Sequence, residues 1–273
     1  MAVAEPSVEF LDIGINLTHE SYDRDRALVL ERAFDAGVNR LILTGATLDS
    51  SQASADFAVQ HPHKLYATAG IHPHHASQCS PEALDALSCL LARPEVVAAG
   101  ECGLDYYRMI APPEQQEAAF RAQIELAISA AKPLFLHCRD AHEDFLRIVK
   151  DYGSQLPRAV VHCFTGSVSQ VVECLDHGLY IGITGWICDE RRGHHLKEVV
   201  TKIPTDRLMI ETDGPYLLPR DLSPKPRDRR NEPAFLPHIA ATIAQARGQT
   251  LESLAAQTTG VAASFFGLPT AYE

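Results

Sequence analysis

A pattern that recurs along the chain and decides the predicted fold is found in the segment Val96-Val97-Ala98-Ala99-Gly100-Glu101-Cys102-Gly103-Leu104-Asp105. A short apolar run typical of a buried β-strand ends at a glycine, and Glu101 follows it directly. We predict a strand over Val96–Ala99 and a turn over Cys102–Asp105. A carboxylate would therefore stand at the carboxyl end of a buried strand.

Three other apolar runs end in the same way: Leu134–Leu136 leads into His137, Ala159–Val161 into His162, and Leu208–Thr212 into Asp213. In a closed parallel barrel the carboxyl ends of the strands meet at one mouth, so these side chains would converge there with Glu101. Carboxylates and imidazoles are ligands of divalent metal ions. Taken alone, a strand-end histidine is often a hydrogen-bonded core residue and an aspartate a helix cap. Four such residues in register favour a metal site.

The alternation of apolar runs and helical segments predicts an α/β fold, a (β/α)₈ TIM barrel, in preference to an open doubly wound sheet. Strands are predicted over Phe10–Ile15, Arg40–Thr44, Leu65–Ala69, Val96–Ala99, Leu134–Leu136, Ala159–Val161, Leu179–Ile183 and Leu208–Ile210. A long loop rich in proline and arginine, Tyr216–Pro237, follows the last strand and should overhang the barrel mouth. We expect one domain over residues 1–273, with residues 1–8 as a flexible N-terminus.

The composition limits the function classes that are open to the chain. Of its 273 residues 46 % are hydrophobic, enough for a large core, and the formal net charge is −11. Binding to duplex DNA depends on neutralising many phosphates, so this charge argues against a broad basic surface. We find no signal peptide and no apolar run of about 18 residues, and we expect a cytoplasmic protein without membrane association. Seven cysteines without a Cys-x-x-Cys pair predict reduced thiols.

A series of motifs, in order along the chain, resembles the TatD-type deoxyribonucleases. The motifs are Asp12–Thr18, Gly70–His74, Gly100–Asp105, Leu136–Ala141, Val161–Gly166, Glu211–Leu217 and Arg229–Pro233, and Gly182–Gly193 is similar to the bacterial branch of that family. The resemblance implies a barrel of the metallo-dependent hydrolase (amidohydrolase-like) type. It also implies a magnesium-dependent 3′-5′ exodeoxyribonuclease that prefers single-stranded DNA, with RNA as a second substrate and a role in repair of damaged DNA.

The resemblance also assigns roles to single residues. Glu101, His137 and His162 match the metal ligands of the family, and Asp213 matches its ligand or water-orienting acid. One departure concerns the first strand, where many family members carry His-x-His and this chain has Gly14-Ile15-Asn16. Since glycine cannot ligate through a side chain and an amide oxygen is a weak donor, Asn16 would be a weak ligand. An oxygen-rich site favours Mg²⁺, with Mn²⁺ or Zn²⁺ as substitutes, and leaves the number of bound ions open.

Substrate contacts are predicted next to these ligands. The resemblance implies that His72 touches the scissile phosphate, which makes it a catalytic candidate with Asp213 and Glu101. Arg139 could clamp a phosphate, and a salt bridge to Asp105 or Asp140 is an alternative that is only slightly less favoured. The other candidates are cationic or aromatic residues that suit an entering strand end: Arg191, Arg192, Trp186 and Tyr216. We expect single-stranded DNA or 3′ DNA ends as partners, and no obligate protein partner.

Two other functions remain open from the sequence. A small-molecule amidohydrolase could use the same scaffold, although such enzymes often carry a bridging lysine where this chain has Glu101. The missing first-strand histidines also allow a non-enzymatic scaffold or protein quality-control factor. An inactive site is disfavoured because the chain carries the full candidate set, Glu101, His137, His162 and Asp213.

Overall fold

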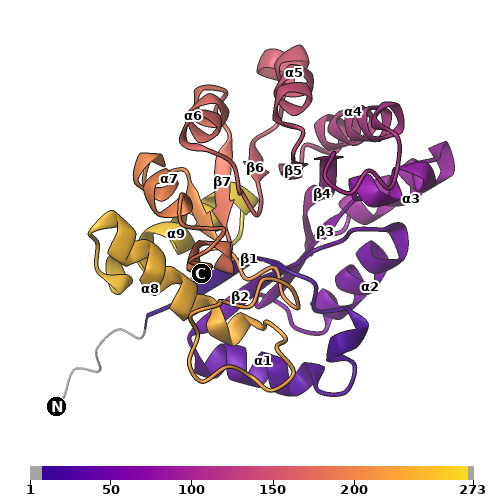
Figure 1. Cartoon of the computed structure of the whole chain (residues 1–273). Helices are drawn as coiled ribbons and strands as arrows, with labels where there is room; N and C mark the ends of the chain where they lie inside the picture. The colour runs from indigo at the N-terminus through magenta and orange to yellow at the C-terminus, as the bar shows by residue number, and fades with distance from the viewer. Residues whose placement is uncertain (1–7, 270–273) are drawn as a thin grey trace.

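The computed structural model describes residues 8–269, and its core is one sheet of eight parallel strands in the order of the chain (Figure 1). The strands are β1 Phe10–Ile15, β2 Val38–Leu43, β3 Leu65–Ala69, β4 Val96–Asp105, β5 Leu134–Arg139, β6 Ala159–Val161, β7 Tyr180–Ile183 and β8 Leu208–Ile210. The predicted (β/α)₈ barrel is confirmed. The flexible N-terminus predicted over residues 1–8 lies, except for Val8, outside the described residues.

Helices surround the strands on the outside (Figure 1). They are α1 Arg26–Asp35, α2 Leu48–Val59, α3 Pro81–Leu91, α4 Pro113–Ala130, α5 His142–Tyr152, α6 Val168–Asp176, α7 Leu196–Lys202, α8 Leu236–Arg247 and α9 Leu251–Phe266. Apolar residues fill the space between this ring and the strands. None of the helices in the described part of the chain is long and apolar enough to cross a membrane.

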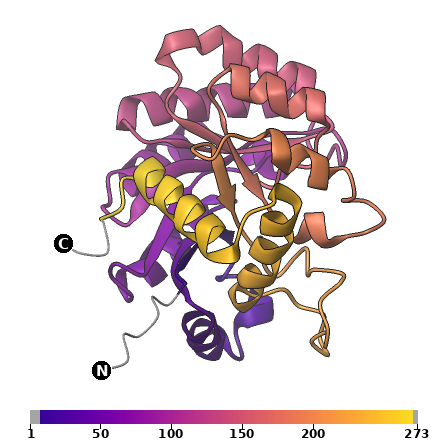
Figure 2. The same ribbon diagram turned by 90° about the vertical axis from the view of Figure 1, so that its left-hand side faces the viewer.

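Helix α9 closes the amino end of the barrel. It runs across the strands with α8 beside it (Figure 2). Its residues Phe265 and Phe266 join a buried cluster with barrel-interior residues such as Ile13 and Phe135. The amino end is therefore filled by apolar side chains, and the polar side chains are left to the carboxyl end.

Strand β4 corrects the prediction for the segment that opened the sequence analysis. The predicted turn over Cys102–Asp105 is wrong, because β4 continues to Asp105 and is buried along its whole length. The pairing with β5 shifts between Ala99 and Cys102 and then resumes. Gly100 and Gly103 have φ values of 136° and 142°, and a Cβ on either would overlap the backbone of β5. These glycines mark an irregular strand and not its end, so Glu101 lies inside β4.

The contact between β8 and β1 is made by side chains and loop backbone. Thr212 donates from its N–H to Oδ1 of Asp12 at 3.0 Å and from its hydroxyl to Oδ2. Two backbone bonds of 2.8 Å follow, from the N–H of Asp213 to the carbonyl of Gly14 and from the N–H of Asn16 to that of Gly214. Burial raises the pKa of Asp12 to about 7. This seam fixes the backbone of Asp213 and Asn16 at the mouth.

Candidate active site

The carboxyl ends of the strands surround a cavity of about 570 Å³. Most of the residues singled out from the sequence line it: Asn16, His72, Glu101, His137, Arg139, His162, Trp186, Asp213 and Tyr216. Arg191 and Arg192 are not among the described residues of this lining. The fold thus brings together the candidate ligands that the sequence spreads over more than a hundred residues.

Glu101 is the point on which three imidazoles converge. Its Oε1 lies 2.7 Å from Nε2 of His162, 2.9 Å from Nδ1 of His137 and 3.5 Å from Nε2 of His72. Burial alone raises the pKa of Glu101, but the charge of His162 and the hydrogen bonds from His137 and His162 outweigh it and hold that pKa well below its usual range. Glu101 is therefore an anion, which is the form that binds a cation.

His137 and His162 each have a second carboxylate on the other ring nitrogen. Nε2 of His137 lies 3.2 Å from Oδ2 of Asp105, and Nδ1 of His162 lies 3.2 Å from Oε2 of Glu211. Burial lowers the pKa of both rings, but the flanking carboxylates more than compensate and raise the pKa of His137 and, more strongly, of His162. A cation on one nitrogen would replace a proton, while the carboxylate on the other nitrogen keeps the ring oriented.

Glu211 has a place in the site that the sequence analysis missed. It is fully buried, and its Oε1 accepts a hydrogen bond from the N–H of Cys163. A Cβ at Gly14 or Gly182 would overlap its carboxylate, so the two glycines leave the space that Glu211 fills. This explains why no side chain stands at position 14. The signal was present, because Glu211 directly follows the apolar run of β8, which is the position where ligand candidates were sought on the other strands.

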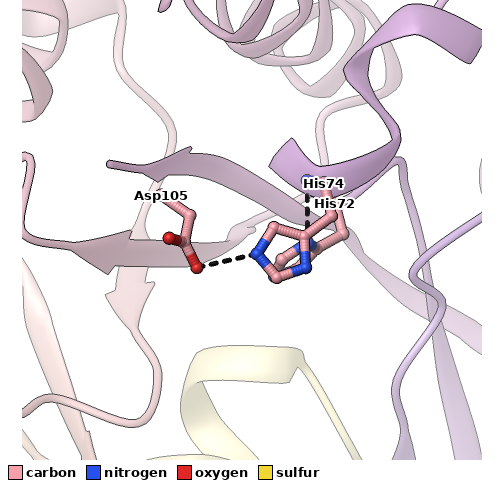
Figure 3. Close-up of side chains that lie close together, drawn as sticks. All are labelled: His72, His74 and Asp105. Carbon is pink, nitrogen blue, oxygen red and sulfur yellow. Dashed lines mark hydrogen bonds and ion pairs between the residues drawn. The ribbon is translucent and has the colours of Figure 1, made fainter. Parts of the chain in front are cut away.

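His72, His74 and Asp105 form a second group beside Glu101 (Figure 3). Nε2 of His74 lies 2.9 Å from Oδ2 of Asp105, and the N–H of His74 donates to Nδ1 of His72 at 3.0 Å. That bond leaves Nε2 of His72 turned toward Glu101. Burial lowers the pKa of His72 to about 3, so its ring is neutral, and because Nδ1 accepts the N–H of His74, the ring proton lies on Nε2. His72 belongs to two groups of potential ligand atoms, one with His74 and Asp105 and one with Glu101 and His137.

Asp213 stands at the edge of this cluster. Its Oδ1 accepts a hydrogen bond of 3.2 Å from Nδ2 of Asn16, which also donates to the carbonyl of Gly214. Desolvation in the cavity raises the pKa of Asp213 to about 7, and the nearby charge of Glu101 acts in the same direction. Asn16 thus holds Asp213 through its amide nitrogen, and Asp213 is a carboxylate that can exchange a proton near neutral pH.

The donor set fits a divalent cation. Glu101, Asp105 and Glu211 are buried carboxylates at one mouth, with Asp213 beside them, and protons on the imidazoles are their main counter-charge. Mixed carboxylate and imidazole donors suit Mg²⁺, Mn²⁺ or Zn²⁺. Glu101, His137 and His162, with His72 or Asp213, are the residues that would hold it.

Two buried glutamines of α4 fix the backbone next to the site. Gln123 accepts from the N–H of Ile71 at 2.7 Å and donates to its carbonyl at 3.0 Å. Gln116 makes the same pair of bonds with Asp105, at 2.8 and 3.1 Å. The two glutamines are seven residues apart, so they lie on one face of the helix. They hold Asp105 itself and the residue that precedes His72.

Arg139 and Trp186 lie together at the rim of the cavity. The guanidinium of Arg139 is 4.1 Å from the ring centre of Tyr107 and 5.8 Å from that of Trp186. Within the described residues it forms no ion pair with Asp105, Asp140 or any other carboxylate. Of the two explanations weighed for Arg139, the salt bridge is therefore absent and the phosphate clamp stays a prediction.

The remaining basic candidates are placed differently. Arg191 is exposed and lies 3.7 Å from Asp189, whose carboxylate also accepts from the backbone N–H of Arg191 and Arg192. Arg191 and Arg192 are both exposed and stay predicted substrate contacts. Arg230, which belongs to the motif Arg229–Pro233, is not such a candidate and pairs with Asp25 at 2.7 Å, away from the cavity.

Comparison with known proteins agrees with this architecture. The family model of TatD related DNase matches residues 11–267. The chain is 52 % identical over 257 residues to the 3′-5′ ssDNA/RNA exonuclease TatD of Klebsiella pneumoniae, and the aligned region covers 94 % of this chain and 97 % of that protein. The protein of the same name from Escherichia coli K12 is 51 % identical over 257 residues, with coverage of 94 % and 98 %.

Solved structures share the fold. The TatD homolog YJJV from Escherichia coli K12 superposes with a TM-score of 0.86 at 26 % identity, covering 96 % of this chain and 99 % of that one. A hydrolase of the TatD family from Entamoeba histolytica gives a TM-score of 0.83 at 28 % identity, with coverage of 94 % and 97 %. With a family model that matches nearly its whole length, the chain belongs to the family of TatD related DNases.

Proposed function

We propose that the protein is a Mg²⁺-dependent 3′-5′ exonuclease of single-stranded DNA, with RNA as a second substrate. The observation that carries the proposal is the convergence of three ring nitrogens on one oxygen of Glu101 at a barrel mouth. Relatives about half identical over nearly the whole chain bear the name 3′-5′ ssDNA/RNA exonuclease, which supports the substrate and the polarity.

Each residue would have a separate task in hydrolysis. Glu101, His137 and His162 would hold the cation, which supplies charge neutralisation for the phosphate and acidifies water. Asp213, with a pKa near 7, is suited to accept the proton of the attacking water, and Asn16 keeps it in position. The neutral ring of His72 and the guanidinium of Arg139, which line the same cavity, would contact the phosphate oxygens.

The shape and charge of the site support a single strand end as substrate. A cavity of about 570 Å³ suits a ligand of nucleotide size. The net charge of −11 argues for local recognition over a broad phosphate-binding surface. Family resemblance supports a role in repair of damaged DNA. All seven cysteines are free, which suits a reducing compartment, and we propose the cytoplasm.

The test is hydrolysis of the same single-stranded oligonucleotide labelled at its 3′ end or at its 5′ end. With Mg²⁺ we expect the 3′ label to appear at once as mononucleotide and the 5′ label to remain on a shrinking ladder. Early release of the 5′ label would contradict the polarity. No cleavage of DNA or RNA would contradict the nuclease proposal and favour a small-molecule hydrolase, which would be indifferent to added oligonucleotide.

A further inference from the structure

Large apolar side chains that are exposed gather at the barrel mouth. Among the described residues, the loop after β4 exposes 61 % of Tyr107, 48 % of Met109 and 60 % of Ile110, and the loop after β8 exposes 52 % of Tyr216. Leu28 on α1 is one of the few comparable residues elsewhere. An apolar patch of this kind, next to a cavity, marks a surface that contacts a ligand.

Tyr107, Arg139 and Trp186 form a row along this rim, which we call the aromatic rim. Arg139 ends β5, and its guanidinium lies between the two rings, 4.1 Å from the centre of Tyr107 and 5.8 Å from that of Trp186. Stacking on Tyr107 orients the guanidinium without consuming its charge, because Arg139 has no carboxylate partner among the described residues. Most of the Tyr107 ring stays in water.

The aromatic rim is continuous with the cavity, since Arg139 and Trp186 also line the cavity that holds Glu101. A strand whose end lies in the cavity must leave it over one side. The neighbouring cavity of about 620 Å³, between the first turns of α5 and α6, is lined by the carboxylates of Asp140, Glu143 and Asp144 and by the imidazoles of His142 and His195. These carboxylates would repel a phosphodiester, whereas the aromatic rim offers one cation and two π-faces.

We propose that the aromatic rim is a base-stacking subsite, in which a nucleobase of the bound strand lies on Tyr107 while Arg139 pairs with an adjoining phosphate. The inference rests on the proposed nuclease function. Every base has a π-face, so the subsite tolerates any sequence. It takes only unpaired bases, because the bases of a duplex are already stacked on one another. Tyr107 thus supplies a physical reason for a preference for single strands.

The test compares two substitutions at Tyr107. Tyr107→Leu keeps an apolar side chain without a ring, and Tyr107→Phe keeps the ring. Loss of one stacked base typically weakens binding about fivefold or more. We expect Tyr107→Leu to raise KM for single-stranded DNA by at least about fivefold with little change in kcat, whereas Tyr107→Phe should have the KM of the wild type.

A binding measurement without turnover checks the same loss of affinity. It follows the fluorescence anisotropy of a labelled oligonucleotide in EDTA. Leu28→Ala is the control for loss of an exposed apolar side chain.

A scan with abasic nucleotides locates the stacked base. In the wild type, an abasic nucleotide at one position counted from the 3′ end should raise KM, and in Tyr107→Leu the same nucleotide should add nothing further. Wild-type KM in Tyr107→Leu, or an abasic penalty that is equal in both proteins, would overturn the inference and leave the nuclease proposal standing. If the wild type neither binds nor cleaves the oligonucleotide, the proposed function fails and the inference fails with it.

Discussion

The proposed role of Asp213 as the base can be tested by a substitution that replaces one oxygen of its carboxylate by an amide nitrogen. Asparagine has the shape of aspartate but accepts no proton near neutral pH, so Asp213→Asn should preserve the cavity and remove the base. We expect kcat to fall about 10²- to 10⁴-fold, the usual contribution of a general base. Affinity for Mg²⁺, measured by calorimetry, should fall far less.

Asn16→Ala is the matched control for Asp213→Asn. It leaves the carboxylate in place and removes the hydrogen bonds that Asn16 donates to Asp213 and to the carbonyl of Gly214. The loss of the bond to Asp213 should reduce kcat by about tenfold or less. An Asp213→Asn enzyme that turned over at the wild-type rate would exclude Asp213 as the base.

At this scale the sequence predicted which side chains converge at the barrel mouth, but it missed Glu211, the carboxylate that pairs with His162. Glu101, His137 and His162 each follow or interrupt an apolar run, so the sequence pattern alone marks them as candidates. All three line the same cavity. Glu211 was missed because Asp213, two residues further along the chain, was interpreted as the polar residue that follows this apolar run. Tyr107 was missed because nothing in the spacing of a loop indicates which side chains stay exposed.

Among the elements, α4 positions the site through Gln123. Leucine has a similar volume but cannot pair with the N–H and the carbonyl of Ile71, and an unpaired buried backbone group costs about 1–3 kcal/mol. We expect Gln123→Leu to lower the free energy of unfolding by roughly 2–4 kcal/mol. Gln115 is exposed on the same helix, and Gln115→Leu should change stability by less than about 0.5 kcal/mol. Equal urea midpoints for the two variants would refute this role.

The seam between β8 and β1 predicts a dependence of stability on pH. Because burial raises the pKa of Asp12 from 3.8 to about 7, the folded protein binds a proton there that the unfolded chain releases. This contribution to stability is complete below about pH 4 and is lost as pH rises through about 7, at up to about 1.4 kcal/mol for each pH unit.

Asp12→Asn removes the titration and keeps the size of the side chain. We expect the wild type to lose stability relative to Asp12→Asn as the pH is raised from 5 to 7, measured by urea unfolding at each pH. Other groups titrate equally in both proteins and cancel in this difference. A constant difference across this range would contradict the raised pKa of Asp12.

How far the sequence predicts an element depends on what ends it. The bounds of β1, β3, β6 and β8 were predicted to the residue, because each of these apolar runs ends where polar side chains or a turn begin. Strand β4 was cut short because glycine was interpreted as a terminator. Gly100 and Gly103 instead allow the chain to pass close to β5 and continue. Sequence alone does not distinguish these two uses of glycine.

In the whole molecule, the two ends of the barrel have different tasks. The amino end is filled by apolar residues and closed by α9, whereas the carboxyl end holds buried carboxylates, imidazoles and the aromatic rim. The predicted barrel already implied this difference between the two ends, since the carboxyl ends of all parallel strands meet at the same mouth. It did not give the positions of Arg191 and Arg192 outside the cavity lining, because loop conformation leaves no periodic signal.

The central claim is that a cation held by Glu101 and its histidines drives hydrolysis, and a Mg²⁺ titration of metal-stripped protein tests it most directly. The measurement is the rate of 3′-nucleotide release from single-stranded DNA by the wild type, by Glu101→Ala, and by Glu31→Ala, which changes an exposed acid on α1. We expect the stripped wild type and Glu31→Ala to be inactive until Mg²⁺ restores them. Glu101→Ala should stay inactive at every Mg²⁺ concentration while its circular dichroism remains that of the wild type. Mg²⁺-dependent release by Glu101→Ala, or full activity of the stripped wild type, would contradict the claim.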